Sequence, residues 1–286
     1  MVADVVMDTL LDGIKLFPFL LITYLVMEYI EHKTSSKTQQ IMKNSGKWGP
    51  IAGSILGVVP QCGFSAAASN LYAGRIITVG TLAAVFLSTS DEMLPILISE
   101  QVNPVTIIRI LAVKVLIGMV IGFLLDLIIR RKKGTEKEEF RIEHMCDHEH
   151  CHCKEGKIFR SAFNHTLQIF IFIIVISFLL NLLIGYVGED KLAALISGKP
   201  VLGPMLSALI GLIPNCASSV VLTQLYLEGV LGAGAMIAGL LSGSGVGLLV
   251  LYRVNDDLKE NLKITIMLYA VGVVFGILIE MLGIVF

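Results

Sequence analysis

Charged residues are scarce in this chain, and their scarcity excludes an ordinary soluble domain. Asp, Glu, Lys and Arg make up 16% of the 286 residues, whereas 55% are hydrophobic. Soluble domains carry about 25% charge, and a soluble core of this size would still leave about a quarter to a third of the chain's surface in water. We therefore expect a polytopic membrane protein whose apolar faces contact the lipid bilayer.

Several other signals are also missing. The chain has no G-x-x-x-x-G-K-[ST] loop, so we expect no direct use of ATP, and no catalytic arrangement indicates an enzyme. The five cysteines are odd in number and do not form the pattern of a disulfide framework. Residues 1–12 contain no Lys or Arg and do not resemble a cleaved signal peptide. The net charge of −1 says little by itself, and we expect no nucleic-acid partner. We expect no resident cofactor, and the oligomeric state is left open.

Apolar segments long enough to cross a membrane fill most of the chain. A spanning helix needs about 20 apolar residues. Runs of about this length occupy residues 10–30, 76–98, 104–129, 163–187, 230–251 and 262–286. Two further runs, residues 49–73 and 203–227, are each interrupted by a proline motif. We predict an all-α polytopic membrane fold in which each half contains a broken helical hairpin, either re-entrant or made of two short spans.

The second half of the sequence repeats the first. When the first half is shifted by 154 positions without a gap, many residues other than Leu, Ile and Val coincide. The coinciding pairs include Gly57 and Gly211, Pro60 and Pro214, Cys62 and Cys216, Ser65 and Ser219, Gly80 and Gly234, Ser88 and Ser242, Gly118 and Gly272, and Gly122 and Gly276. Chance is a poor explanation for so many matches in one register. We predict two membrane repeats, residues 1–130 and 161–286, joined by a hydrophilic loop over residues 131–160.

The basic residues indicate that the two repeats are inserted in opposite orientations. Four lysines between residues 33 and 47 place the first connecting loop in the cytosol, and nine Lys or Arg between residues 130 and 160 place the central loop there too. Each repeat then crosses the membrane an odd number of times. We predict two inverted-topology repeats, integral to the cell membrane, with the N-terminus outside and the central loop cytosolic. Inverted repeats with broken helices are a recurring plan of secondary transporters.

The two proline motifs bring polar side chains to membrane depth. Proline breaks a helix, and irregular backbone is stable within a membrane only where it is buried in protein or lines a cavity. Each motif adds an amide, a thiol and a hydroxyl, which offer oxygen and soft sulfur ligands. The candidate substrate-binding residues of a shared central site are Gln61, Cys62, Ser65, Asn215, Cys216 and Ser219. The alternative is that each cysteine is a small apolar filler and each amide caps a broken helix.

A second polar interruption, residues 88–92, lies within the apolar run 76–98. Carboxylates in a spanning segment are costly and usually functional. Ser90, Asp91 and Glu92 are therefore further candidates for binding a cation or the coupling proton. The metal ligands of the central site would be Cys62, Cys216, Asp91 and Asn215. If the span ends earlier, the two acids lie only at the membrane interface.

Four other charged residues occur within or beside apolar runs. Arg109 and Lys114 are placed where they could pair with the acids at positions 91 and 92 and leave no net charge. Asp126 and Glu280 coincide in the repeat and lie near predicted helix ends. We expect these two carboxylates to face water.

The central loop contains a dense cluster of metal-binding residue types. Four His, three Cys and three acids occur between residues 143 and 153, and imidazole and thiolate suit Zn, Cu, Ni and Co. The candidate metal ligands are His144, Cys146, His148, His150, Cys151, His152 and Cys153. Their spacing fits no standard zinc finger, and the cluster lies outside the repeat. It is either a cytosolic collector or sensor of metal ions or a solvated loop with adventitious affinity.

With these motifs in view, the chain resembles the family described as ten-helix heavy-metal exporters. These are distant relatives of the organoarsenical efflux permeases, and some members are labelled manganese transporters. The resemblance covers nearly the whole chain and rests on Val59-Pro60-Gln61-Cys62-Gly63, Ser88-Thr89-Ser90-Asp91-Glu92 and Ile213-Pro214-Asn215-Cys216. It implies metal or metalloid export, with ten helices if each broken hairpin is counted as two.

The sequence thus predicts a secondary transporter that exports a metal or metalloid ion from the cytosol. A pair of thiols favours a soft substrate such as trivalent arsenic, whereas acid and amide groups favour a harder ion such as Mn²⁺. Proton coupling through the acids at positions 91 and 92 is one option. The alternatives are a permease for a small organic solute or anion, held by backbone donors at the N-termini of broken helices, and a channel.

Overall fold

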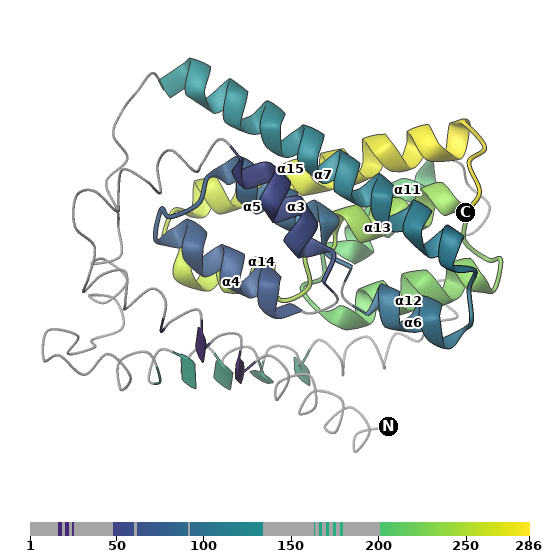
Figure 1. The fold of residues 1–286 in the computed structure, drawn as a ribbon, viewed down its shortest axis with the longest axis horizontal. Helices are drawn as coiled ribbons and strands as arrows, with labels where there is room; N and C mark the ends of the chain where they lie inside the picture. The colour runs from purple at the N-terminus through teal and green to yellow at the C-terminus, as the bar shows by residue number, and fades with distance from the viewer. Residues whose placement is uncertain are drawn as a thin grey trace, which may run out of the picture.

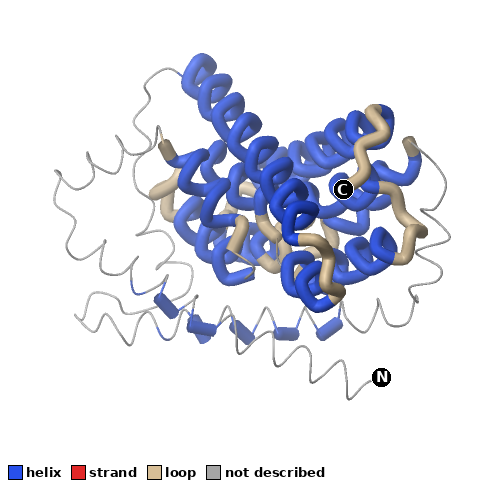
Figure 2. The backbone as a smooth tube through the Cα atoms, turned by 45° about the vertical axis from the view of Figure 1, so that its right-hand side comes forward, coloured by secondary structure: helices blue, strands red, loops and turns tan. Residues whose placement is uncertain are grey.

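The structure, a computed structural model, describes residues 48–59, 62–90, 92–133 and 201–286 together with positions 17–18, 21–22, 25, 163, 166–167, 170–171, 174–175 and 178–179. These residues form helices joined by loops, with no strand among them (Figure 2). The predicted all-α fold is therefore confirmed for this part of the chain. The predicted hydrophilic loop lies outside the described residues beyond position 133.

The described helices follow one order in both halves (Figure 1). In the first half they are α3 (Gly49–Gly57), α4 (Cys62–Ala73), α5 (Val79–Ser88), α6 (Met93–Ser99) and α7 (Pro104–Lys133). In the second half they are α11 (Leu202–Gly211), α12 (Cys216–Leu227), α13 (Ala233–Ser242), α14 (Gly247–Val254) and α15 (Leu258–Met281). Helices α4 to α7 each begin 154 positions before α12 to α15, in the register found in the sequence.

Four described segments are long and apolar enough to cross a membrane. They are Val79–Ser99, Pro104–Ile129, Ala233–Val254 and Leu258–Met281. The first contains α5 and α6, and the third contains α13 and α14, so the apolar run predicted over residues 230–251 is two helices with a break between them. The protein is an integral membrane protein, as its composition predicts.

Helices α3 and α4 are each too short to cross the membrane alone. They have 9 and 12 residues, which correspond to about 14 and 18 Å at 1.5 Å per residue. The hydrocarbon core of a bilayer is about 30 Å thick. The break after α3 and its counterpart between α11 and α12 therefore divide each predicted hairpin into two short helices.

Glycines allow the long helices α7 and α15 to pack closely against the backbones of α5 and α13, respectively. A Cβ atom added at Gly122 of α7 would lie 2.6 Å from the carbonyl oxygen of Gly80 in α5. In the second half, a Cβ atom at Gly276 of α15 would lie 2.7 Å from the carbonyl oxygen of Gly234 in α13. Small residues permit such close packing between membrane helices. The same contact is thus made twice, 154 positions apart.

The expectation that Asp126 faces water is wrong, and Glu280 is half-buried rather than fully exposed. Asp126 is buried, and its two oxygens accept hydrogen bonds from the Gly80 amide at 3.0 Å and the Thr78 hydroxyl at 2.8 Å. Glu280 accepts from the Gly234 amide at 2.8 Å. Each carboxylate therefore caps the N-terminus of the neighbouring short helix, where amides lack helical partners and the helix dipole favours negative charge.

Replacing Asp126 by alanine should destabilise the fold measurably. The change leaves the amide of Gly80 without its acceptor at the buried start of α5, and loss of a capping group costs about 1–2 kcal/mol. We expect a lower melting temperature of the detergent-solubilised protein, and a smaller decrease for Glu280→Ala because Glu280 is only half-buried. An unchanged melting temperature for Asp126→Ala would show that the cap contributes nothing to stability.

The two halves pack through an exchange of short helices. Helix α4 lies against α14 of the other half, and α12 lies against α6, on opposite sides of the central pair α5 and α13 (Figure 1). At the first contact, the Ser69 hydroxyl donates to the carbonyl oxygen of Gly247 at 2.7 Å. Each half therefore completes its packing with a helix from the other, which places the breaks of both halves in the centre of the molecule.

An ion pair also joins the two halves outside this centre. Arg75, in the turn between α4 and α5, donates two hydrogen bonds to the carboxylate of Glu260 in α15, at 2.8 and 3.1 Å. The hydrogen bond to this carboxylate raises the pKa of the Arg75 guanidinium, so the arginine stays charged. The guanidinium also lies 5.1 Å from the centre of the Tyr72 ring, which provides a favourable cation–π contact.

Candidate functional site

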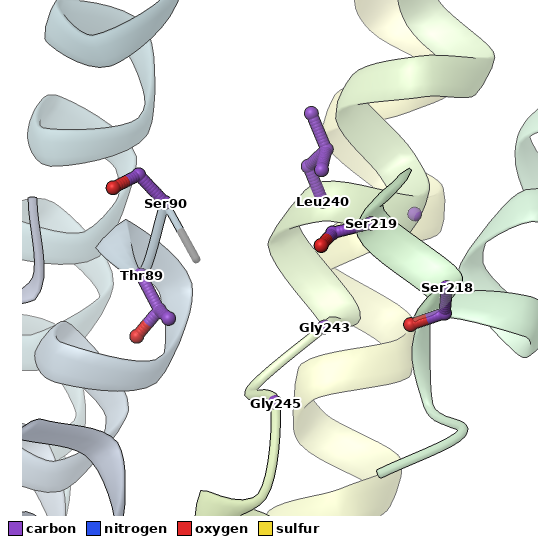
Figure 3. Close-up of a pocket in the computed structure, with 8 residues that line it drawn as sticks. Thr89, Ser90, Ser218, Ser219, Leu240, Gly243 and Gly245 are labelled. Carbon is purple, nitrogen blue, oxygen red and sulfur yellow. The ribbon is translucent and has the colours of Figure 1, made fainter. Parts of the chain in front are cut away.

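A small cavity of about 10 Å³ lies where helix breaks from both halves meet. It has room for about one water molecule. The first half contributes Thr89 and Ser90, and Figure 3 shows these two residues opposite the residues of the second half. The second half contributes Ser218, Ser219, Gly239, Leu240, Gly243 and Gly245. Hydroxyl-bearing residues of both halves thus line the cavity, together with glycines and Leu240.

The cavity forms because α5 and α13 both end inside the molecule. Thr89, after the last residue of α5, has ψ of 125°, and Gly243, after the last residue of α13, has ψ of 113°. Neither residue continues the helix, so the last carbonyl groups of both helices lack helical amide partners. Gly245 then takes a φ of +52°, which favours glycine, and the chain turns into α14.

The serine hydroxyls around the cavity donate their protons to backbone carbonyls. Ser90 donates to the carbonyl of Val58 at 2.6 Å, and Ser219 donates to that of Cys216 at 2.7 Å. Ser218 donates to the carbonyl of Asn215 at 2.8 Å. A hydroxyl whose proton is used in this way still has lone pairs to offer as an acceptor. The cavity wall therefore offers hydroxyl oxygens as acceptors, which suit a cation.

Lys114 brings a positive charge to the edge of this cavity. Its side chain is fully buried near the middle of the span formed by α7. The ammonium donates to the carbonyl of Leu240 at 2.9 Å and to the carbonyl of Thr89, and both of these residues line the cavity. Arg109, by contrast, is exposed on α7. Lys114 thus connects α7 with the ends of α5 and α13.

The second proline motif lies beside the cavity. Asn215 is 4% exposed and precedes α12, where its side-chain oxygen accepts from the Ala217 amide at 3.5 Å. Cys216, the first residue of α12, is also buried, and Ser219 lies on the cavity wall less than one turn later. The structure therefore brings Asn215, Cys216 and Ser219 to the same region as Ser90.

Ser65 of the first proline motif lies elsewhere. It is fully buried at the contact between α4 and α14, where a Cβ atom added at Gly247 would lie 2.7 Å from that of Ser65. Glu92 is half-buried immediately before α6. Among the residues that the structure describes, no three His, Cys, Asp or Glu side chains are grouped so that they could hold a metal ion.

Other predicted site residues lie outside the described part of the chain. These are Gln61, Asp91, the side chain of Cys62, and the loop residues His144, Cys146, His148, His150, Cys151, His152 and Cys153. Their roles stay predictions.

Sequence reasoning missed Ser218 and the two backbone carbonyls that bind Lys114. Backbone oxygens are present at every residue, so no residue type in the sequence marks the ones that face a cavity. The sequence already marks Lys114 as a charge within an apolar run, and a comparison of the halves marks it again, because the equivalent residue in α15 is the apolar Leu268. A charge that one repeat has and the other lacks marks a position where the halves differ in chemistry.

Comparison with known protein families adds to this geometry. The chain matches the family described as "Putative, 10TM heavy-metal exporter" over residues 1–184, 135–255 and 164–283. The chain belongs to this family. The matches together extend over nearly the whole sequence, so the predicted family resemblance is confirmed. No curated protein and no solved structure matches this heavy-metal exporter family member.

Proposed function

We propose that this protein is a secondary transporter that exports a metal or metalloid ion from the cytosol through the central cavity. The observation that carries the proposal is the cavity formed by helix breaks of both halves, which has the hydroxyl-bearing Ser90 on one side and Ser219 on the other. Irregular backbone at membrane depth is stable where it lines such a cavity. Family membership supports metal export as the activity.

In this proposal the two halves are inverted repeats around the cavity, with the N-terminus outside and the central loop in the cytosol. The paired contacts of Gly80 with Gly122 and of Gly234 with Gly276 support a common architecture for the halves. The distribution of Lys and Arg supports their opposite orientation. The short lengths of α3 and α4 favour re-entrant hairpins over full crossings.

The chemistry of the cavity supports a cation more than an organic anion. Anions bind at helix N-termini through backbone amides. At the start of α12, however, the Ala217 amide is bonded to the Asn215 side chain, and the Ser218 amide lies 3.4 Å from the Asn215 carbonyl oxygen. The oxygens of Ser90, Ser218 and Ser219 remain as acceptors, and acceptors attract cations.

The proposed substrate ligands are the amides and thiols of the two proline motifs together with the cavity hydroxyls. They are Gln61, Cys62, Asn215, Cys216, Ser90 and Ser219, with Asp91 and Glu92 supplying charge or the coupling proton. The cluster at residues 144–153 would collect metal ions on the cytosolic side and deliver them to this site.

The test is metal-resolved transport into proteoliposomes, with Mn²⁺, Zn²⁺, Co²⁺, Ni²⁺, Cu⁺ and arsenite assayed side by side. We expect saturable transport of at least one of these ions above protein-free liposomes. A variant without residues 143–153 should keep its rate at saturating substrate. Transport of an organic anion with none of the metal or metalloid ions would replace this proposal with the organic-solute permease.

Substitution of the cysteines should separate soft from hard substrates. Cys216→Ser keeps the size of the side chain but removes a soft ligand, so arsenite affinity should fall at least about tenfold, whereas Mn²⁺ affinity should change by less than about threefold. Cys62→Ser should lower arsenite affinity in the same way. The two decreases in affinity should not add, because both residues would act on one site. A double variant that transports arsenite normally would reduce both cysteines to packing residues.

A further inference from the structure

Lys114 occupies a position that is built for a cation. Thr89 follows the last residue of α5, and Leu240 lies in the last turn of α13. The carbonyl groups at such positions have no helical amide partners, and the C-terminus of a helix carries partial negative charge. Two helix ends, one from each half, therefore direct carbonyl oxygens at the same ammonium group.

The cost of burying this lysine indicates that the charge has a function. A charged side chain near the middle of a membrane span is unfavourable and is retained where it serves a pathway. The equivalent residue of α15, Leu268, is also fully buried, so the second half has an apolar side chain where the first half has a charge. In broken-helix transporters, half-helix C-termini and unwound carbonyls form the sites of coupling cations.

We propose that the Lys114 ammonium is an internal substitute for the transported cation. The inference rests on the proposed function and narrows its substrate to a hard divalent cation of the Mn²⁺ kind, because carbonyl and hydroxyl oxygens are hard ligands. An arriving cation takes the carbonyl oxygens of Thr89 and Leu240 and repels the ammonium, whose flexible stem lets it withdraw.

This exchange of cations explains how the empty protein could complete its cycle. A pair of carbonyl-rich helix ends with no cation between them would leave partial charges unsatisfied in a medium of low dielectric constant. Lys114 satisfies them after the substrate has left, so the empty protein can return to the cytosolic-facing state. Without the ammonium, the protein can change state only when a metal ion is bound.

The test compares net uptake with exchange in proteoliposomes that contain the full chain. Lys114→Met should lose net Mn²⁺ uptake into metal-free vesicles at least about tenfold, yet keep Mn²⁺/Mn²⁺ exchange within about twofold of the unmodified protein. Its equilibrium affinity for Mn²⁺ in detergent should rise at least about tenfold, because the competing ammonium is gone. Leu268→Met, at the equivalent position, is the control that should change neither rate.

Other outcomes would overturn the role of Lys114, the assignment of a hard cation or the proposed function. If the unmodified protein transports Mn²⁺ and Lys114→Met loses uptake and exchange together without tighter Mn²⁺ binding, the lysine is structural and only this inference fails. Equal uptake, exchange and binding in both proteins also overturn it. If the unmodified protein transports arsenite but not Mn²⁺, metal export stands and the assignment of a hard cation is wrong. If it transports no metal or metalloid ion, the proposed function fails as well.

Discussion

Replacing Gly276 by leucine is expected to lower the melting temperature of the detergent-solubilised protein by about 6–12 °C, or to prevent folding altogether. A Cβ atom at this position would lie 2.5 Å from the Cβ atom of Ala238 and 2.7 Å from the carbonyl oxygen of Gly234. The Cβ atom of Ala238 is bonded directly to the backbone of α13, and the Gly234 oxygen is part of that backbone. Neither atom can therefore move away by rotation of a side chain. Overpacking of this kind costs about 3 kcal/mol or more.

The matched control is Ala270→Leu, which enlarges a side chain of the same helix on its exposed face. We expect its melting temperature to stay close to that of the unmodified protein, because added apolar surface there faces detergent or lipid. The corresponding change in the first half, Gly122→Leu, should be about as damaging as Gly276→Leu, since its Cβ atom would meet the carbonyl of Gly80 and the side chain of Pro50. If Gly276→Leu and Ala270→Leu melt alike, the close approach of α13 and α15 is not required for folding.

The sequence predicts the helices of this fold well because their signals are local. Apolar runs near 20 residues indicate spans, and a proline within such a run indicates a break. The duplicated register strengthens each signal, since a break seen at Pro60 is expected again at Pro214. The break between α13 and α14 is harder to find, because the residues there are mostly small and apolar and no proline marks it.

The partners of charged residues are not encoded locally, and for Asp126 the prediction is wrong. Asp126 is close to a helix end in sequence, which favours exposure, but tertiary packing places it against the N-terminus of α5, 46 positions earlier. The pairing of Lys114 with an acid stays a prediction, because position 91 lies outside the described part of the chain. Its described partners include two backbone carbonyls, one of them 126 positions away.

For the candidate site, the sequence identifies the regions that meet but not the surface they form. Ser90 and Ser219 come from different kinds of motif, yet both line one cavity. Their hydroxyl protons are already used by backbone carbonyls. This arrangement, which makes the cavity an acceptor of cations, depends on hydrogen-bond directions that only the folded backbone determines.

Replacing Asn215 by serine should lower the affinity of the transporter for its metal ion at least about tenfold without changing its melting temperature. Serine caps a helix about as well as asparagine, so the start of α12 should be preserved. Serine lacks the amide oxygen that we propose as a ligand beside the cavity. The measurement is the concentration dependence of initial transport in proteoliposomes, with melting curves recorded on the same preparations.

Two further variants separate ligand loss from damage to the helix. Gln224→Ala removes an amide from the exposed face of the same helix and should leave transport unchanged. Asn215→Ala removes both the amide oxygen and the cap, so it should lose affinity as Asn215→Ser does and in addition lose about 1 kcal/mol of stability. If Asn215→Ser transports normally and only Asn215→Ala is impaired, Asn215 acts as a helix cap alone. The metal ion must then be bound by other groups around the cavity.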